Sequence, residues 1–203
     1  MRPVLELPGR AVYHLTGPGP AAFYLVLDGV GGVLVNLPPY DAVLQAGLDA
    51  LAPIRVIFLP SHRGARDAAR WREATGAPAA AYGDEGARVA GGVDIALDRG
   101  WRLTREVDFL PLAGRTAGSC AMRVKRRPVI LFAGPALDRQ PTGWPGITAH
   151  PDDDSFENRL LGAVGLRHLR FDYVFTDDFD PALSRIGPEA AVAVRHHLDA
   201  ALA

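Results

Sequence analysis

The sequence predicts a layered α/β fold in which short buried strands alternate with amphipathic helices. Three observations support this: short apolar runs of β-forming residues, intervening segments with apolar residues at helical spacing, and Pro- or Gly-rich turns between them. Such an alternation favours sheets whose faces are covered by helices. With 203 residues, 48% of them hydrophobic, the chain can bury a large core without disulfides. It contains no repeat and no low-complexity tract, so we expect a single domain over residues 1–203.

The first part of the chain is expected to form a hairpin, a helix and a buried strand. Two β-forming runs, at residues 21–28 and 32–36, are separated by a glycine-rich turn. Asp41 can cap a helix that runs to about Ala52, because the apolar residues there recur at helical spacing. A continuous apolar strand follows at residues 55–59.

The middle of the chain continues this alternation. A loop at residues 61–64 leads into a helix that extends through Glu73, and a short strand is expected at residues 78–82. Three further strands are expected, at residues 106–112, 119–124 and 127–132.

The C-terminal part combines two helices with a last strand. Asp154 and Glu157 have capping-box spacing, which predicts a helix from Asp154 to about Leu169. Residues 171–175 form the last strand. Pro188 is suited to the first position of a helix and opens the closing one.

The composition argues against several classes of function. The formal net charge is -1, so there is no bulk electrostatic attraction to nucleic acid or to an anionic membrane. Cys120 is the only cysteine, which excludes an internal disulfide and a cysteine zinc cluster. No apolar run approaches the roughly 18 residues that span a bilayer, and the first residues lack the apolar core of a signal peptide. The arginine-rich composition is typical of GC-rich bacterial genomes, and we expect a cytoplasmic protein.

Four segments carry a resemblance to one hydrolase superfamily. Residues 58–62 (Phe-Leu-Pro-Ser-His) end a strand with a histidine, and residues 114–119 (Gly-Arg-Thr-Ala-Gly-Ser) form a glycine-rich loop. Residues 131–137 and 173–178 follow as the ends of two later strands. In this order and framing the sequence resembles the metallo-β-lactamase superfamily, which includes glyoxalase-type thioester hydrolases. The resemblance spans nearly the whole chain.

The resemblance implies a four-layer αββα sandwich, an α/β (α+β) architecture in which two sheets lie between outer helices. In that superfamily the metal ligands lie on loops at one end of the sandwich. A Thr-His-x-His-x-Asp-His segment supplies the first ligands, and a Gly-His-Thr-x-Gly-Ser loop adds a histidine. A Phe-x-Gly-Asp segment adds a bridging aspartate, and a last histidine follows a late strand.

Most of these ligands are replaced in this sequence. A catalytic zinc site needs three protein ligands and an open position for water, and arginine cannot serve as a ligand. We therefore expect that the zinc site is lost and that the protein binds no metal and no other cofactor. The residues at the ligand positions, in chain order, are His62, Gly64, Arg66, Asp67, Arg115, Pro135 and then Asp177 or Asp178.

The first interpretation of function is a metal-free, non-hydrolytic binding or interaction module. Its ligand would be a small anionic or neutral molecule in the former metal cleft, where an arginine can bind a carboxylate or phosphate. The residues expected to line this cleft are His62, Arg66, Arg115, Asp177 and Asp178.

Two alternatives remain open. The chain could be a hydrolase of a small ester, thioester or phosphoester through a rearranged site around His62, with Asp67 and Asp177 as further catalytic candidates. It could also be a structural subunit that pairs with itself as a homodimer or with an active relative. Fold alone does not assign an activity.

Several candidates also have a purely structural explanation. Asp67 is expected in the first turn of a helix, where the helix dipole favours a carboxylate. A salt bridge between an arginine and an aspartate such as Asp177 would fill a vacated metal site. Cys120 lies within an apolar strand pattern, which predicts a small buried hydrophobic residue.

Overall fold

The computed structural model describes residues 1–98 and 100–202 and divides the chain into two compact units. The first unit contains Met1–Ala81 and Gly86–Ala96, and the second contains Tyr82–Glu85 and Leu97–Ala203. The structure defines each unit individually. The single-domain organisation expected from the sequence stays a prediction.

The first sheet has seven strands that follow one another in chain order. Its first four strands form an antiparallel meander, and the next two run parallel to the fourth. The hairpin predicted from the apolar runs is confirmed, because β3 and β4 pair antiparallel. The strands are β1 (Arg2–Leu7), β2 (Arg10–Leu15), β3 (Ala22–Leu27), β4 (Gly31–Val35), β5 (Ile54–Phe58), β6 (Ala79–Tyr82) and β7 (Ile95–Leu97).

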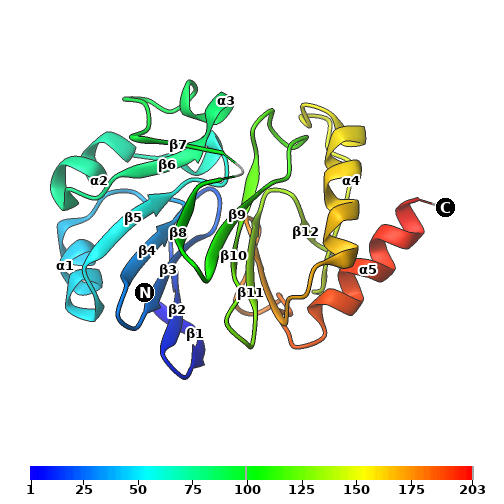
Figure 1. Cartoon of the computed structure of the whole chain (residues 1–203), viewed down its shortest axis with the longest axis horizontal. Coiled ribbons are helices and arrows are strands. Elements are labelled where there is room, and N and C mark those ends of the chain that lie inside the picture. Colours follow the sequence, from blue (N-terminus) through cyan, green and yellow to red (C-terminus); the bar gives the residue numbers. More distant parts are fainter. Residues whose placement is uncertain (99, 203) are drawn as a thin grey trace. The chain divides into compact units, whose positions relative to one another are not determined.

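Two helices pack against the first sheet, α1 (Ala42–Leu51) and α2 (Ala68–Thr75) (Figure 1). Each contributes one fully buried side chain to the core, Leu48 from α1 and Trp71 from α2. The cap predicted for α1 is confirmed, since the Asp41 carboxylate accepts a hydrogen bond of 2.8 Å from the backbone N–H of Leu44.

The second unit contains a five-stranded sheet in the order β14-β11-β10-β9-β8. Neighbouring strands from β8 to β11 pair antiparallel, and β14 runs parallel to β11. The strands are β8 (Arg102–Thr104), β9 (Val107–Pro111), β10 (Cys120–Val124), β11 (Ile130–Gly134) and β14 (Tyr173–Thr176). The unit also has the two-stranded ribbon of β12 (Asp138–Arg139) and β13 (Pro145–Gly146) and all but the last residue of the short helix α3 (Gly83–Gly86).

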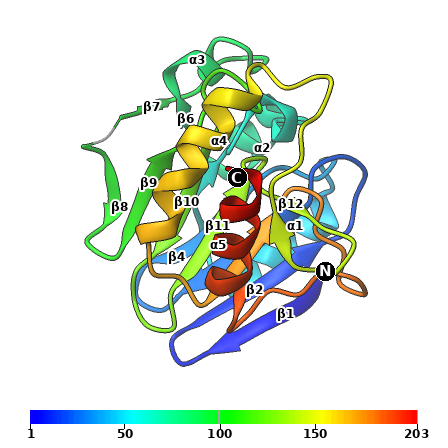
Figure 2. The same cartoon turned by 90° about the vertical axis from the view of Figure 1, so that its right-hand side faces the viewer.

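Helices α4 (Phe156–Val164) and α5 (Ala190–Ala201) share an apolar core with the second sheet and lie side by side in Figure 2. The start of each helix corrects the sequence analysis. The cap of α4 is Ser155 rather than Asp154, because the Ser155 hydroxyl accepts the N–H of Asn158 at 3.1 Å. Pro188 does not occupy the first helical position of α5, because Glu189 is the cap and the helix begins one residue later.

Within residues 1–98 and 100–202, no helix is both long and apolar enough to cross a membrane.

Removal of the α1 cap is expected to destabilise the first unit. Asp41→Ala should lower the free energy of unfolding by about 1 kcal/mol, because the N–H of Leu44 loses its partner at the helix start. Asp41→Asn retains a side-chain oxygen and should restore most of the loss. Chemical denaturation followed by Trp fluorescence measures the three proteins, and an Asp41→Ala variant as stable as the parent would contradict the capping role.

Candidate functional site

In the first unit, the loop expected to carry metal ligands follows β5 and begins with two buried residues. Pro60 and Ser61 are buried, and His62 is half-buried at the start of a short 3-10 helix that ends at Gly64. Of the potential ligand positions in this loop, His62 and Asp67 carry a side chain that can bind a metal.

Gly64 stands where the resemblance places the second histidine, and the structure leaves no room there for a side chain. A Cβ at this position would overlap with the amide Oδ1 of Asn36, a buried residue directly after β4. Asn36 is held in place because its Nδ2 donates to the carbonyl of Ala21 at 2.9 Å. The backbone is held too, since the N–H of Leu37 donates to the carbonyl of Gly64 at 2.8 Å. Position 64 is therefore a packing contact between two loops.

Asp67 and Arg66 close the same loop. Asp67 is the N-terminal cap residue of α2, one position earlier than the first helical turn in which the sequence analysis placed it. It has a left-handed backbone with a φ of 53° and makes no capping hydrogen bond through its side chain. Its carboxylate instead accepts the N–H of Tyr40 at 2.9 Å. Arg66 is exposed. The carboxylate of Asp67 thus ties the start of α2 to the segment before α1.

In the second unit, Arg115 lies on the glycine-rich loop between β9 and β10. Its Nη1 forms ion pairs with Asp152 at 2.7 Å and Asp153 at 3.2 Å, and its side chain is 13% exposed. Partial burial lowers the pKa of the Arg115 guanidinium, but the hydrogen bond and charge of Asp152 and the charges of Asp153 and Asp138 outweigh it, so the pKa is raised. The arginine expected to face an empty cleft is therefore paired with carboxylates.

A second arginine, Arg159 of α4, connects the loops around Arg115. Its side chain is fully buried, and its Nη2 donates to Asp138 at 2.6 Å. Its Nη1 donates to the carbonyl of Thr148 at 2.7 Å and lies 3.4 Å from Asp153. Asp138 also contacts the imidazole of His150 at 3.1 Å. Asp153 lies between Arg159 and Arg115, so the two arginines belong to one charged network.

The glycine-rich loop approaches α4 closely enough to exclude any side chain at Gly114. This residue has a φ of 124°, and a Cβ there would overlap with the backbone of Arg159. The carbonyl of Gly114 also accepts the N–H of Ser155 at 2.9 Å. The contact fixes Arg115 beside the start of α4.

The last two motifs of the resemblance lie on neighbouring strands of the second sheet. Pro135 follows β11 and offers no side-chain donor for a metal. Asp177 follows β14, and its N–H donates to the carbonyl of Gly134 at 3.1 Å. The carboxylate of Asp178 accepts the hydroxyl of Thr176 at 2.6 Å and the N–H of Arg139 at 2.8 Å. Asp178 thus joins the end of β14 to β12.

Cys120 is buried at the start of β10, as the sequence predicted. Burial raises the pKa of its thiol above the ordinary value. A buried, protonated thiol is a packing residue and is unreactive as a nucleophile or metal ligand.

The zinc centre that the resemblance implies does not fit these residues. Zinc in proteins is held by imidazole, thiolate and carboxylate groups. Position 64 has no side chain and is closed by Asn36, position 115 is an ion-paired arginine, and position 135 is a proline. Among residues 1–98 and 100–202, no group of three or more His, Cys, Asp and Glu side chains could hold a metal ion.

Comparison with solved structures shows the fold. The B3 metallo-β-lactamase BLEG-1 matches 83% of this chain and 92% of its own, with a TM-score of 0.67 and 18% identity. A metallo-β-lactamase from Cronobacter sakazakii with a HARLDQ motif matches 100% of this chain and 93% of its own, with a TM-score of 0.67 and 16% identity. The subclass B3 enzyme BJP-1 of Bradyrhizobium japonicum matches 94% and 90%, with a TM-score of 0.62 and 14% identity.

These matches confirm the predicted α/β fold class and the resemblance at the level of the fold. The chain has the fold of the metallo-β-lactamases, in which each unit contributes one mixed sheet with its helices. No protein-family model and no curated protein matches the sequence.

The contact between Gly64 and Asn36 can be tested by a double-mutant cycle. Gly64→Ala should lower the free energy of unfolding by about 1–3 kcal/mol, because the new Cβ must displace Asn36. Asn36→Gly removes the obstructing amide and tolerates the left-handed backbone at this position. In that background Gly64→Ala should cost less, by about 1 kcal/mol or more. Equal costs in the two backgrounds, measured by chemical denaturation, would contradict the contact.

The buried network can be tested with two arginines that differ in burial. Arg159→Met should lower the free energy of unfolding by about 3–5 kcal/mol, because Asp138 and Asp153 lose their buried counter-charge. The matched control is Arg167→Met, which removes an exposed pair with Asp199 at 2.6 Å and should cost less than about 1 kcal/mol. Similar losses for the two variants would show that the Arg159 network does not stabilise the second unit.

Proposed function

We propose that this chain, a protein with the metallo-β-lactamase fold, is a non-hydrolytic binding module that has exchanged its zinc loops for structural contacts. The observation that carries the proposal is the contact between Gly64 and Asn36. A histidine at position 64 would require Asn36 to leave its hydrogen bond with Ala21. The first ligand loop is therefore built around a different side chain, in a conformation that a ligand at position 64 cannot share.

The second unit supports the same proposal through charge. A zinc ligand at position 115 would be a neutral histidine, whereas Arg115 carries a permanent positive charge. Asp152 and Asp153 compensate this charge, and Asp153 also lies within 3.4 Å of the buried Arg159. Replacing the dication by a guanidinium with two carboxylates keeps the loops together without a metal.

The charges around Arg115 also bear on whether the ligand is anionic or neutral. The sequence left open an anionic and a neutral ligand, and an uncompensated Arg115 would favour the anion. In the structure Arg115 and Arg159 pair with the carboxylates of Asp138, Asp152 and Asp153, and these five groups together carry a formal charge of -1. We therefore favour a small neutral polar ligand. Inorganic phosphate should leave the NMR signals of the loop around Arg115 unmoved, and saturable shifts there would favour the anion instead.

Metal content tests the proposal directly. The purified, tag-free protein is exposed to zinc, manganese or iron, desalted and measured by elemental analysis. We expect less than about a tenth of an equivalent of each metal, because Gly64, Arg115 and Pro135 offer no side-chain ligand at three of the positions where the resemblance expects one. His62→Ala is the matched control and should retain the same background amount.

The metal-dependent form of the alternative hydrolase would give the opposite result, whereas a metal-free hydrolase with His62 as its base would be detected only by activity assays. About one or two equivalents of metal, lost in His62→Ala, would contradict the proposal and support a rearranged site around His62. Asp67 and Asp177 are the further ligand or catalytic candidates of that alternative, and esters, thioesters and phosphoesters would be its test substrates. The structure favours this alternative less, because the Asp67 carboxylate is engaged by the N–H of Tyr40.

A further inference from the structure

Helix α5 presents a second row of side chains beside the row that it buries. The buried row consists of Ala190, Val194 and Leu198, which follow one another at i, i+4 spacing. The second row recurs at spacings of three and four residues, so its members share one side of the helix. This row is called here the α5 stripe and consists of the cap residue Glu189 with Val192, Ala193, His196 and His197.

The α5 stripe lines a hollow of about 500 Å³ in the second unit. Thr142 and Trp144, from the turn that joins β12 to β13, line it as well. The helix and the ribbon pack directly on each other, because a Cβ at Gly146 of β13 would overlap with the ring of His197. A hollow of this size is within the range of small-molecule sites.

Trp144 gives the hollow an aromatic surface that is fixed by its surroundings. Its ring packs against the apolar core of the second unit, and the guanidinium of Arg185 lies over the ring, 5.7 Å from the centroid. The backbone is held too, since the carbonyl of Trp144 accepts the N–H of Gln140 at 2.8 Å. A surface that is ordered before binding lowers the entropic cost of holding a ligand.

The shape of the lining groups favours a flat ligand. Two imidazoles, those of His196 and His197, join Trp144 as planar groups, and their centroids are 6.1 Å apart with the rings inclined at 65°. Aromatic rings pack favourably against other rings in offset or edge-to-face arrangements. Val192, which is 65% exposed, adds an aliphatic contact. The hollow thus offers an aromatic ring both planar and apolar partners.

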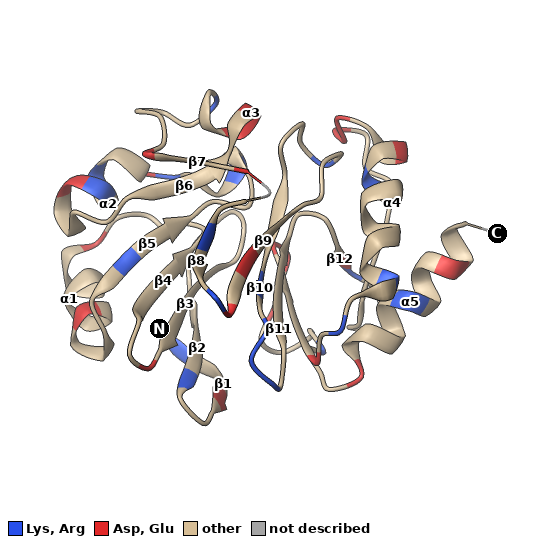
Figure 3. Ribbon diagram, in the orientation of Figure 1, with Lys and Arg blue, Asp and Glu red and all other residues tan. Residues whose placement is uncertain are grey.

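The charge of the lining favours a ligand with a positively charged group. Among the described residues that line the hollow, Glu189 is the only one with a permanent charge. Its carboxylate makes no capping hydrogen bond in α5, so it can accept one from a ligand. Neutral imidazoles accept hydrogen bonds as well. The arginine and the aspartate within α5, which Figure 3 shows on the helix, do not line the hollow.

We propose that this hollow binds an aromatic amine, with the ring of the ligand against Trp144 and the imidazoles and its ammonium group against Glu189. The inference does not rest on the proposed loss of zinc, because none of the residues that line the hollow stands at a ligand position of the resemblance. The metal content of the protein and the binding of an amine are therefore independent measurements.

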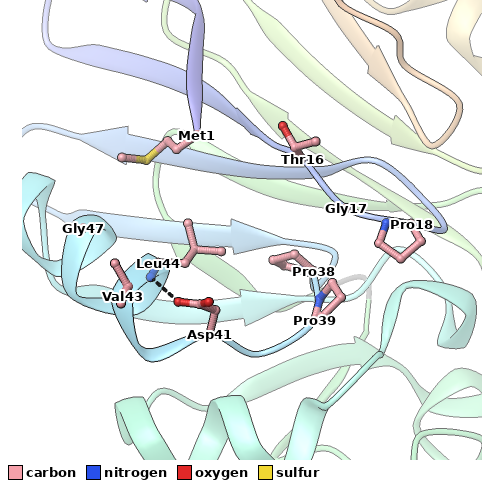
Figure 4. Close-up of a pocket in the computed structure, with 10 residues that line it drawn as sticks. All are labelled: Met1, Thr16, Gly17, Pro18, Pro38, Pro39, Asp41, Val43, Leu44 and Gly47. Carbon is pink, nitrogen blue, oxygen red and sulfur yellow. Dashed lines mark hydrogen bonds between the residues drawn. The ribbon is translucent and has the colours of Figure 1, made fainter.

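The hollow beside α1 provides an internal comparison (Figure 4). Its volume is similar, about 550 Å³, but no aromatic ring is among its described lining residues. Prolines and aliphatic side chains such as Pro38 and Val43 form much of it. Its carboxylate, that of Asp41, already accepts the N–H of Leu44. We expect no aromatic amine to bind there.

NMR titration of the full chain with tryptamine, indole and indole-3-acetate tests the proposal, because the three probes share a ring and differ in charge. Tryptamine should bind with a dissociation constant of about 0.1–1 mM. Indole-3-acetate should bind roughly ten-fold more weakly, with indole between the two. The indole N–H signal of Trp144, identified with Trp144→Phe, should shift saturably. The signal of Trp71, whose N–H donates to the carbonyl of Pro38 at 2.9 Å in the first unit, and those of α1 should not shift.

Two substitutions separate the charge of the hollow from its shape. Glu189→Gln should reduce the preference for tryptamine over indole-3-acetate from roughly ten-fold to about two-fold, because the ammonium loses its counter-charge. The matched control is Glu157→Gln, since Glu157 is an exposed glutamate at the start of α4 that does not line the hollow, and the preference should persist. Ala193→Leu should weaken all three probes by about ten-fold, because the longer side chain fills the hollow. Unfolding midpoints check that each variant folds.

Three results would overturn the proposal. The first is the absence of a saturable shift of the Trp144 signal with any probe up to its solubility. The second is an affinity that does not depend on the charge of the probe, or that Glu189→Gln and Glu157→Gln change equally. The third is an Ala193→Leu variant that folds and binds as the parent does. Charge-dependent binding at Trp144 that is weakened by Ala193→Leu, with the charge preference reduced only in Glu189→Gln, supports the proposal.

Discussion

The contact between Asn36 and Gly64 is the constraint on which the first ligand loop depends. Asn36 follows β4 with a left-handed φ of 54°, and its amide is fixed by the carbonyl of Ala21. The amide oxygen then takes the space beside Gly64, where a side chain would otherwise project. The loop that begins with His62 therefore needs a glycine at position 64. The carboxylate of Asp67, at the end of this loop, accepts a hydrogen bond from the N–H of Tyr40. Local packing and hydrogen bonds of Asn36 and Asp67 thus hold this part of the chain.

In the second unit, the loops at the ligand positions are held by charged side chains. The fully buried Arg159 forms ion pairs with Asp138 of β12 and with Asp153, which precedes α4. Asp153 also forms an ion pair with Arg115. Buried charges persist only when they are paired and hydrogen-bonded, so these loops are interdependent. A metal ion would join the same kind of segments through shared ligands. In this unit the arginines join the segments through shared carboxylates.

Features set by local chemistry could be predicted from the sequence, and those set by distant partners could not. The Asp41 cap and the β3–β4 hairpin follow from short-range spacing and were predicted correctly. The cap of α4 was misplaced by one residue because Asp154 and Ser155 are both good capping residues, and only the backbone conformation decides between them. The only sequence signal for Arg159 is its position on the apolar side of α4, because its partner Asp138 lies 21 residues away.

In the candidate site too, local features could be predicted from the sequence and contacts between distant residues could not. The ligand replacements could be read from the motifs, but the partner of Arg115 could not, since Asp152 is 37 residues distant and lies in a loop. Likewise, no local pattern relates Asn36 to Gly64, because their contact arises only when the segments after β4 and β5 meet. Burial of charge and steric exclusion are properties of the folded chain, so the sequence indicated that ligands were missing without showing what had taken their place.

Diffraction at the zinc absorption edge, from crystals grown with zinc in excess, tests the central claim most directly. The account predicts no anomalous peak within bonding distance of His62, with the Asn36 amide against Gly64 and Arg115 paired with Asp152 and Asp153. An anomalous peak held by His62 and at least two other side chains, with Asn36 or Arg115 displaced, would contradict it.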